Sequence, residues 1–176
     1  MRGFTLVELL VVIAIIGVLA SVIVLIINPL ELMKRSKDTT RLKDLDNISS
    51  VINISMQEGS LSPSSIVSIL CKESGSYPCT GRSNTGSRVT DGTGWIKADL
   101  ASNNAVKFPT LPIDPVNNNE YHYTYCADSD KWEINAILES DSLKAKMAQD
   151  GGNAYDKYEV GSNYFLIAAS GGSCDY

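Results

Sequence analysis

The sequence predicts an α+β protein in which a long N-terminal helix packs on a small antiparallel sheet. Three patterns carry this prediction. The first is the apolar run 6–27, whose only charged residue is Glu8. The second is an apolar stripe with three- and four-residue spacing farther along the chain. The third is a pair of aromatic and β-branched runs, 121–127 and 131–139. At 176 residues, the chain has room for this helix and one small globular domain.

The apolar run is long enough to cross a membrane. As a helix rising ~1.5 Å per residue it would span ~33 Å, about the thickness of a bilayer core. It is too long for a cleaved secretory signal, and no A-x-A-like site follows it. Glu8 inside such a span costs about 2.5 to 3.5 kcal/mol on insertion scales. We therefore expect a partner for Glu8 from another molecule, since the chain offers none nearby.

The helix is predicted to continue beyond the span. Pro29 cannot donate a backbone hydrogen bond, so we expect a bend there within one helix over 4–58, ~80 Å long, whose N-terminal half projects from the head. The basic residues of 34–43 alternate with Asp38 and Asp44, a pattern typical of a solvated, salt-bridged helix face. The stripe that should cover a sheet consists of Leu42, Leu45, Ile48, Ile52 and Met56.

The segment after this helix is less regular. Gly59 is expected to end the helix, and Ser62-Pro63 indicates the start of a short helix reaching Leu70. Glycine, serine, threonine and asparagine dominate 72–94, which predicts an irregular surface region. Trp95 and Ile96 should return to the core.

The second half of the chain predicts the sheet. Runs 121–127 and 131–139 are joined by Asp128-Ser129-Asp130 and predict an antiparallel hairpin. Alternation places Tyr123 and Tyr125 on one face and Cys126 on the other. A short helix in 142–150 and strands 155–160 and 163–169 complete the prediction.

The four cysteines form an even set without the CxxC spacing of a zinc or redox site. Two disulfides are expected, which indicates an oxidising compartment. Three connectivities are open. We favour Cys71 with Cys79, which closes a short loop, and Cys126 with Cys174, which ties the C-terminus to a strand.

The composition argues against several function classes. A net charge of −5 disfavours a nucleic-acid surface. The one histidine, His122, lies in a predicted strand, and no HExxH or GxSxG motif is present, so we expect no enzyme activity and no cofactor. Calcium is a weak alternative: Asp150, Asn153 and Asp156 offer oxygen ligands without the EF-hand pattern, and solvated turns explain them equally well.

The residues Gly3-Phe4-Thr5-Leu6-Val7-Glu8 resemble the processing site of type IV prepilins and of type II secretion pseudopilins. The resemblance implies cleavage after Gly3 by a prepilin peptidase, methylation of the Phe4 amine, and a role for Glu8 in assembly. It also implies that Gly17 and Pro29 bound a stretch of helix that can unwind in a filament. The implied division is a leader over 1–3, a transmembrane and polymerisation helix over 4–30, and a pilin head over 31–176.

A second stretch carries a weaker resemblance. Residues 111–123, LPIDPVNNNEYHY, match the pattern LPxDPxxNxxYxY of major pseudopilins and related pilins. Those proteins usually have Trp-Gly after the Asp-Pro, where this chain has Val116-Asn117. The departure favours a pilin-like relative over a close homologue of a secretion subunit.

The resemblance implies a structural subunit of a type IV pilus or pilus-like filament. Its expected partners are further copies of the chain, the prepilin peptidase and an inner-membrane assembly platform. The implied location is the cytoplasmic membrane before assembly and the cell surface afterwards. The basic residues after the span would by themselves favour the opposite orientation, but the cysteines and the processing motif outweigh them. The alternatives are a pseudopilin of a type II secretion or DNA-uptake system and a monomeric membrane-anchored binding protein.

Overall fold

The computed structural model describes residues 3–26, 28–59, 69–72, 77–102, 108–167 and 172–176. Its N-terminal part consists of two helices, α1 (Leu6–Ile26) and α2 (Pro29–Gly59). The helix is thus interrupted where a bend or loosening at Pro29 was expected, and the expected continuous helix over 4–58 is instead two helices. The Asn28 side chain accepts hydrogen bonds from the N–H groups of Leu30 (3.2 Å) and Glu31 (3.3 Å), so Asn28 caps α2 and Pro29 takes its first position. A proline lacks an N–H, and the first position of a helix does not need one.

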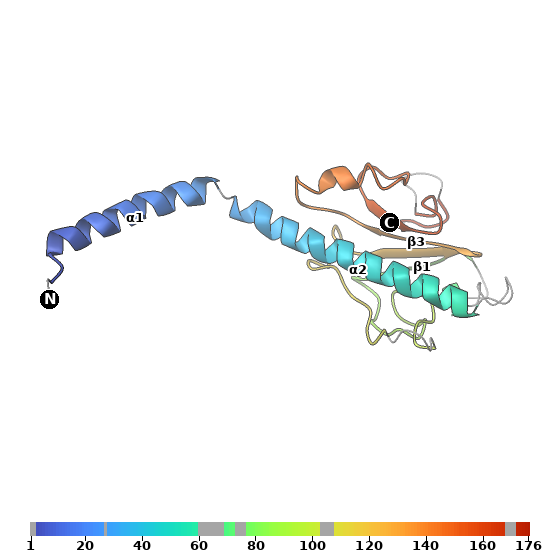
Figure 1. Cartoon of the computed structure of the whole chain (residues 1–176). Helices are drawn as coiled ribbons and strands as arrows, with labels where there is room; N and C mark the ends of the chain where they lie inside the picture. The colour runs from blue at the N-terminus through green and yellow to red at the C-terminus, as the bar shows by residue number, and fades with distance from the viewer. Residues whose placement is uncertain (1–2, 27, 60–68, 73–76, 103–107, 168–171) are drawn as a thin grey trace.

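The two helices have different surroundings (Figure 1). α1 projects away from the rest of the chain, whereas α2 lies along the sheet and closes the core. The predicted stripe on α2 is confirmed for Leu45, Ile48 and Ile52, which are fully buried, while Leu42 and Met56 are partly buried. A helix apolar on one face and polar on the others is the form expected of one that covers a sheet.

The sheet has four antiparallel strands in the order β1-β2-β3-β4. The predicted hairpin is confirmed, with Tyr125 paired to Ile134 and Cys126 to Glu133. Its strands are shorter than expected, and β1, in the segment predicted to be irregular, was missed. The strands are β1 (Cys79–Arg82), β2 (Thr124–Asp128), β3 (Lys131–Ala136) and β4 (Tyr158–Gly161).

The two faces of the sheet bury different kinds of side chain. The face toward α2 carries Tyr123, Tyr125, Trp132 and Ile134, which join Trp95 in the main apolar core. The opposite face carries a polar layer and the Cys126 half-cystine, and the C-terminal segment packs on it through Leu166 and Ile167. The polar side chains of this layer that are at most 3% exposed are His122, Thr124, Glu133 and Asn135, with Glu159 on the edge strand.

Several local predictions need correction. The region 72–94 contains β1 and the buried Ser83, whose hydroxyl accepts a hydrogen bond from the Tyr123 N–H at 2.9 Å. The predicted strand 163–169 forms no strand in its described part, 163–167, where Ile167 makes an isolated bridge with Cys174. The predicted helix in 142–150 is a single 3₁₀ turn, Lys144–Lys146. Most of the short helix predicted over 62–70 lies outside the described residues.

Candidate assembly site

The processing residues lie in an exposed, non-helical segment before α1. Gly3 has no atom within 4 Å of the position that a Cβ would occupy, and the Phe4 side chain is 84% exposed. Neither residue belongs to the helix. An enzyme that cuts after Gly3 would therefore meet an accessible backbone.

Thr5 and Glu8 together cap the start of α1. The Thr5 hydroxyl and the Thr5 N–H both donate to Glu8 Oε2, at 2.7 and 2.9 Å, and the Glu8 N–H donates to the Thr5 hydroxyl at 3.3 Å. This arrangement is a capping box. We did not foresee it, although Thr-x-x-Glu ahead of an apolar run is its sequence signature. In the single chain, Glu8 therefore has a partner within its own first turn.

Apolar side chains are exposed along α1 as far as Ile23. The window Leu6–Ile23 has a mean hydropathy of 3.0 and none of it is buried. In water, such a surface would expose far more apolar area than a soluble protein normally shows. Its length and composition fit a membrane span, and the same surface suits packing against other apolar helices.

The two residues expected to bound a stretch that unwinds have different settings. Gly17 lies in the middle of α1, which is helical on both sides of it. Pro29 begins α2. The break between the helices thus lies at the proline end of this stretch, and 17–26 is helical in the single chain.

Arg41 fixes α2 to the head through a buried charge cluster. Its guanidinium donates to Asp38 at 2.8 Å and, through two nitrogens, to Asp114 at 2.6 and 2.9 Å. It also pairs with Glu139 at 2.7 Å. Arg41 and both aspartates have fully buried side chains. The predicted solvated face over 34–43 is therefore wrong at Asp38 and Arg41, because acidic groups from distant segments enclose the arginine.

Asp38 also holds the backbone that follows β3. Its carboxylate accepts N–H groups of Glu139, at 2.9 and 3.1 Å, and of Ser140, at 2.7 Å. Burial alone would raise the pKa of Asp38, but the hydrogen bonds from Ser140, Glu139 and Arg41 outweigh it and hold that pKa below its usual range. Farther along α2, Asp44 accepts a hydrogen bond from the Tyr123 hydroxyl at 2.9 Å.

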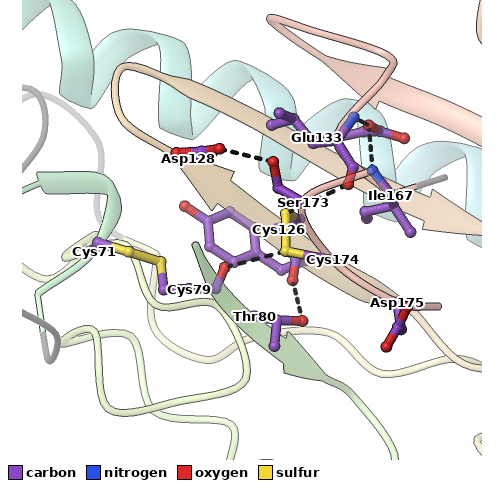
Figure 2. The surroundings of a disulfide bond; sticks show 12 residues. Cys71, Cys79, Thr80, Cys126, Asp128, Glu133, Ile167, Ser173, Cys174 and Asp175 are labelled. Atoms are coloured by element: carbon purple, nitrogen blue, oxygen red, sulfur yellow. Dashed lines mark hydrogen bonds between the residues drawn. A yellow bond between two sulfur atoms is a disulfide. The ribbon is translucent and has the colours of Figure 1, made fainter. Parts of the chain in front are cut away.

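The cysteines pair as the sequence favours. Cys71 is joined to Cys79 and Cys126 to Cys174, each with a Cα–Cα distance of 6.1 Å. Figure 2 shows the second disulfide between the sheet and the C-terminal segment, next to Ser173, whose hydroxyl donates to Asp128 at 2.7 Å. The disulfide and this hydrogen bond fasten the end of the chain to the hairpin.

Two of the three residues considered for calcium have protein partners, whereas Asn153 Oδ1 is buried without a hydrogen-bond partner among the described residues. Asp150 accepts the N–H groups of Gly152 (3.0 Å) and Glu159 (2.8 Å), and Asp156 pairs with Lys157 at 3.1 Å. Across the described ranges, no three acidic, histidine or cysteine side chains are grouped as a metal site requires.

An apolar projecting helix with one carboxylate in its first turn, carried by a disulfide-bonded α+β head, fits a class of proteins anchored in a membrane by an N-terminal helix. The match to a known family narrows this class. Residues 1–24 match the prokaryotic N-terminal methylation motif, which is characteristic of type IV pilins and pseudopilins. Neither the curated proteins nor the solved structures gave a match to the chain. The motif supports a type IV pilin-like or pseudopilin protein, a class that is structural rather than enzymatic.

Proposed function

We propose that the chain is a structural subunit of a type IV pilus or pilus-like filament and that it polymerises through α1. A prepilin peptidase removes residues 1–3 and methylates the new amine of Phe4. The processed subunit waits in the cytoplasmic membrane, and an assembly platform then adds it to a filament that reaches the cell surface. The observation that carries this proposal is the strongly apolar, unburied window Leu6–Ile23 of α1, whose only charged residue is Glu8 and which begins inside a matched methylation motif.

Glu8 gives this association its register. We infer that, in the filament, Glu8 pairs with the Phe4 amine of a neighbouring subunit. Apolar helices can slide past one another at little cost, but a desolvated charge pair is satisfied at one axial offset only. The capping contact with Thr5 competes with this pairing, because both use the same carboxylate. Assembly would exchange one partner of Glu8 for another.

The first experiment is to shear filaments from cells that express the chain and to identify their main subunit by intact mass. The proposal expects a subunit that begins at a methylated Phe4. If the processed chain is found only inside the envelope, it acts as a pseudopilin of a secretion or DNA-uptake system. If the chain keeps residues 1–3 and remains in the membrane as a monomer, it is an anchored binding protein and the proposal fails.

A further inference from the structure

Two buried glutamates lie side by side on the polar face of the sheet. Glu133 on β3 is fully buried and Glu159 on β4 is 2% exposed. In the antiparallel register, Glu133 is opposite Gly161 and Asn135 is opposite Glu159. The two carboxyl groups are therefore diagonal neighbours on the face that the C-terminal segment covers.

The hydrogen bonds of the two carboxyl groups differ. Glu133 Oε2 accepts two backbone N–H groups of the C-terminal segment, from Leu166 at 2.7 Å and Ile167 at 3.0 Å, and Figure 2 shows Glu133 beside Ile167. Glu159 Oε2 accepts one, from Ala154 at 3.0 Å. Two N–H donors favour the ionised form at Glu133 more than one does at Glu159.

Each carboxyl group keeps a second oxygen with no donor. The Oε1 atoms of Glu133 and Glu159 are buried and have no hydrogen-bond partner in the part of the chain that the structure describes. The fully buried Asn135, on the same face of β3, is also without a partner that satisfies its amide. Two ionised carboxylates could not occupy this place together without a large desolvation and repulsion cost.

The charges around the pair do not relieve this cost. Among the described residues, no ion pair includes either glutamate. The loop before β4 adds another acid, Asp150, which accepts the Glu159 N–H. From β3 the neighbouring group is the neutral Asn135, and from the C-terminal segment it is the backbone of Leu166 and Ile167.

We propose that Glu133 and Glu159 share one proton, donated by Glu159 to the ionised Glu133, and that loss of this proton to solvent loosens the C-terminal segment from the sheet. The step leaves two adjacent carboxylates under Leu166 and Ile167. Because the disulfide of Cys126 and Cys174 persists, the result is a local opening rather than detachment. The pair is then a pH-dependent latch, and it does not depend on filament assembly.

The direction of the pH dependence follows from burial. Burial, together with the neighbouring Glu133 and the charge of Asp150, raises the pKa of Glu159 to about 8, although the hydrogen bond from the Ala154 N–H opposes this shift. Burial also raises the pKa of Glu133. The folded chain thus keeps a proton that an unfolded glutamate, with a pKa of about 4.3, gives up. This contribution to stability falls as the pH rises from about 4.3 to about 8 and is level above that range.

Glu159→Gln tests the latch, because glutamine imitates the protonated acid and can donate to Glu133. The full chain in detergent micelles is followed from pH 5 to pH 9 by its melting temperature and by the hydrogen-exchange protection of Leu166 and Ile167. We expect the wild type to lose protection at these two amides above pH 8 while β2 and β3 stay protected. The variant should keep its protection and lose most of the pH dependence. Glu120→Gln removes an exposed acid and should behave like the wild type.

Two results would overturn the proposal. One is wild-type protection at Leu166 and Ile167 that does not change between pH 5 and pH 9, or changes equally in Glu159→Gln. The other is a rise in the wild-type melting temperature on adding calcium chloride, reversed by EDTA and absent from Glu159→Gln. That result would show that the two carboxylates hold a cation and not a proton. If Glu159→Gln fails to fold, the proposal is tested by the pH dependence of hydrogen-exchange protection at Leu166 and Ile167 in the wild type and in Glu159→Asp.

Discussion

Arg41 lies at the centre of the contacts that fix α2 to the head. One guanidinium contacts Asp38 from its own helix, Asp114 from the segment between β1 and β2, and Glu139 from the segment after β3. The planar fork of arginine suits this enclosure, because it can give paired hydrogen bonds to Asp114 and still reach two other acids. A lysine is a single point charge and cannot make this set of contacts.

Arg41→Ala should therefore be strongly destabilising. It leaves Asp38 and Asp114 buried without their cation, for which losses of about 3 to 5 kcal/mol are typical. The measurement is the free energy of unfolding of the full chain in detergent, from urea titration. Lys43→Ala, an exposed position on the same helix, is the control and should change stability by less than about 0.5 kcal/mol. A loss below about 1 kcal/mol for Arg41→Ala would contradict the account.

We expect the ionised Asp38 to make a contribution to the free energy of unfolding that is lost at acid pH. Its pKa is held below the usual value in the folded state, so it contributes stability above the unfolded pKa of about 3.9, and this is lost as the pH falls through the lower folded pKa. Asp38→Asn should lower the free energy of unfolding at pH 7, and its difference from the wild type should shrink below about pH 4. Unfolding at several pH values measures this. A difference that stays constant from pH 7 to pH 2 would refute the role of the Asp38 charge.

We expect removal of residues 1–3 to depend on Gly3. Because the segment before α1 is exposed and non-helical, we expect recognition to depend on the small size of Gly3 rather than on any fold around it. Gly3→Val should give a chain that retains residues 1–3, detected by intact mass in membrane fractions. An undiminished yield of chains starting at methylated Phe4 would count against the proposed cleavage site.

At the scale of elements, the periodicity of apolar residues predicted those helices and strands whose pattern repeats among residues close together in the sequence. The stripe of α2 and the alternation along β2 and β3 were recognisable because each repeats within a few positions. By contrast, β1 is the short sequence Cys-Thr-Gly-Arg, which has weak strand propensity and forms because it pairs with β2, over 40 residues away. The apolar run 163–169 looked like a strand, yet Leu166 and Ile167 instead cover the polar face.

In the candidate site, too, the features formed by neighbouring residues were predictable and those formed by distant residues were not. The apolar helix, Glu8 and the processing residues could be read from one continuous stretch. The burial of Arg41 could not be predicted from the sequence, because it depends on Asp114 and Glu139, which are distant from Arg41 along the chain. Asp38 and Arg41 at a spacing of three residues gave the only local signal, and exposed helix faces carry the same spacing. The Glu133 and Glu159 pair likewise depends on strand register, which sequence alone left open.

The disulfides are expected to contribute unequally. Loop-closure entropy depends on the separation of the joined residues, which is 8 for Cys71 and Cys79 and 48 for Cys126 and Cys174. In the chain-entropy model these correspond to about 2.5 and about 4 kcal/mol. Replacing each pair by alanine and measuring unfolding in detergent compares them. The account predicts the larger loss for the C-terminal pair; equal losses, or the reverse order, would contradict it.

At the scale of the whole molecule, the projecting helix and the compact head divide two tasks. The head is held together by its own core, its charge cluster at α2 and its two disulfides. The window Leu6–Ile23 of α1 is not buried by the head, so its apolar surface is free. A subunit of this form can enter a filament through α1 while its head keeps one structure.

The measurement that tests this most directly is filament formation by Glu8→Ala, with membrane-fraction protein and electron microscopy taken from the same cells. Removing the charge eases insertion, so the variant should reach the membrane at wild-type levels. Without a partner for the Phe4 amine, helix register is lost, and filaments should be absent or irregular in their spacing. Wild-type numbers of filaments with the wild-type helical rise would contradict the account, and would leave Glu8 only its capping contact with Thr5.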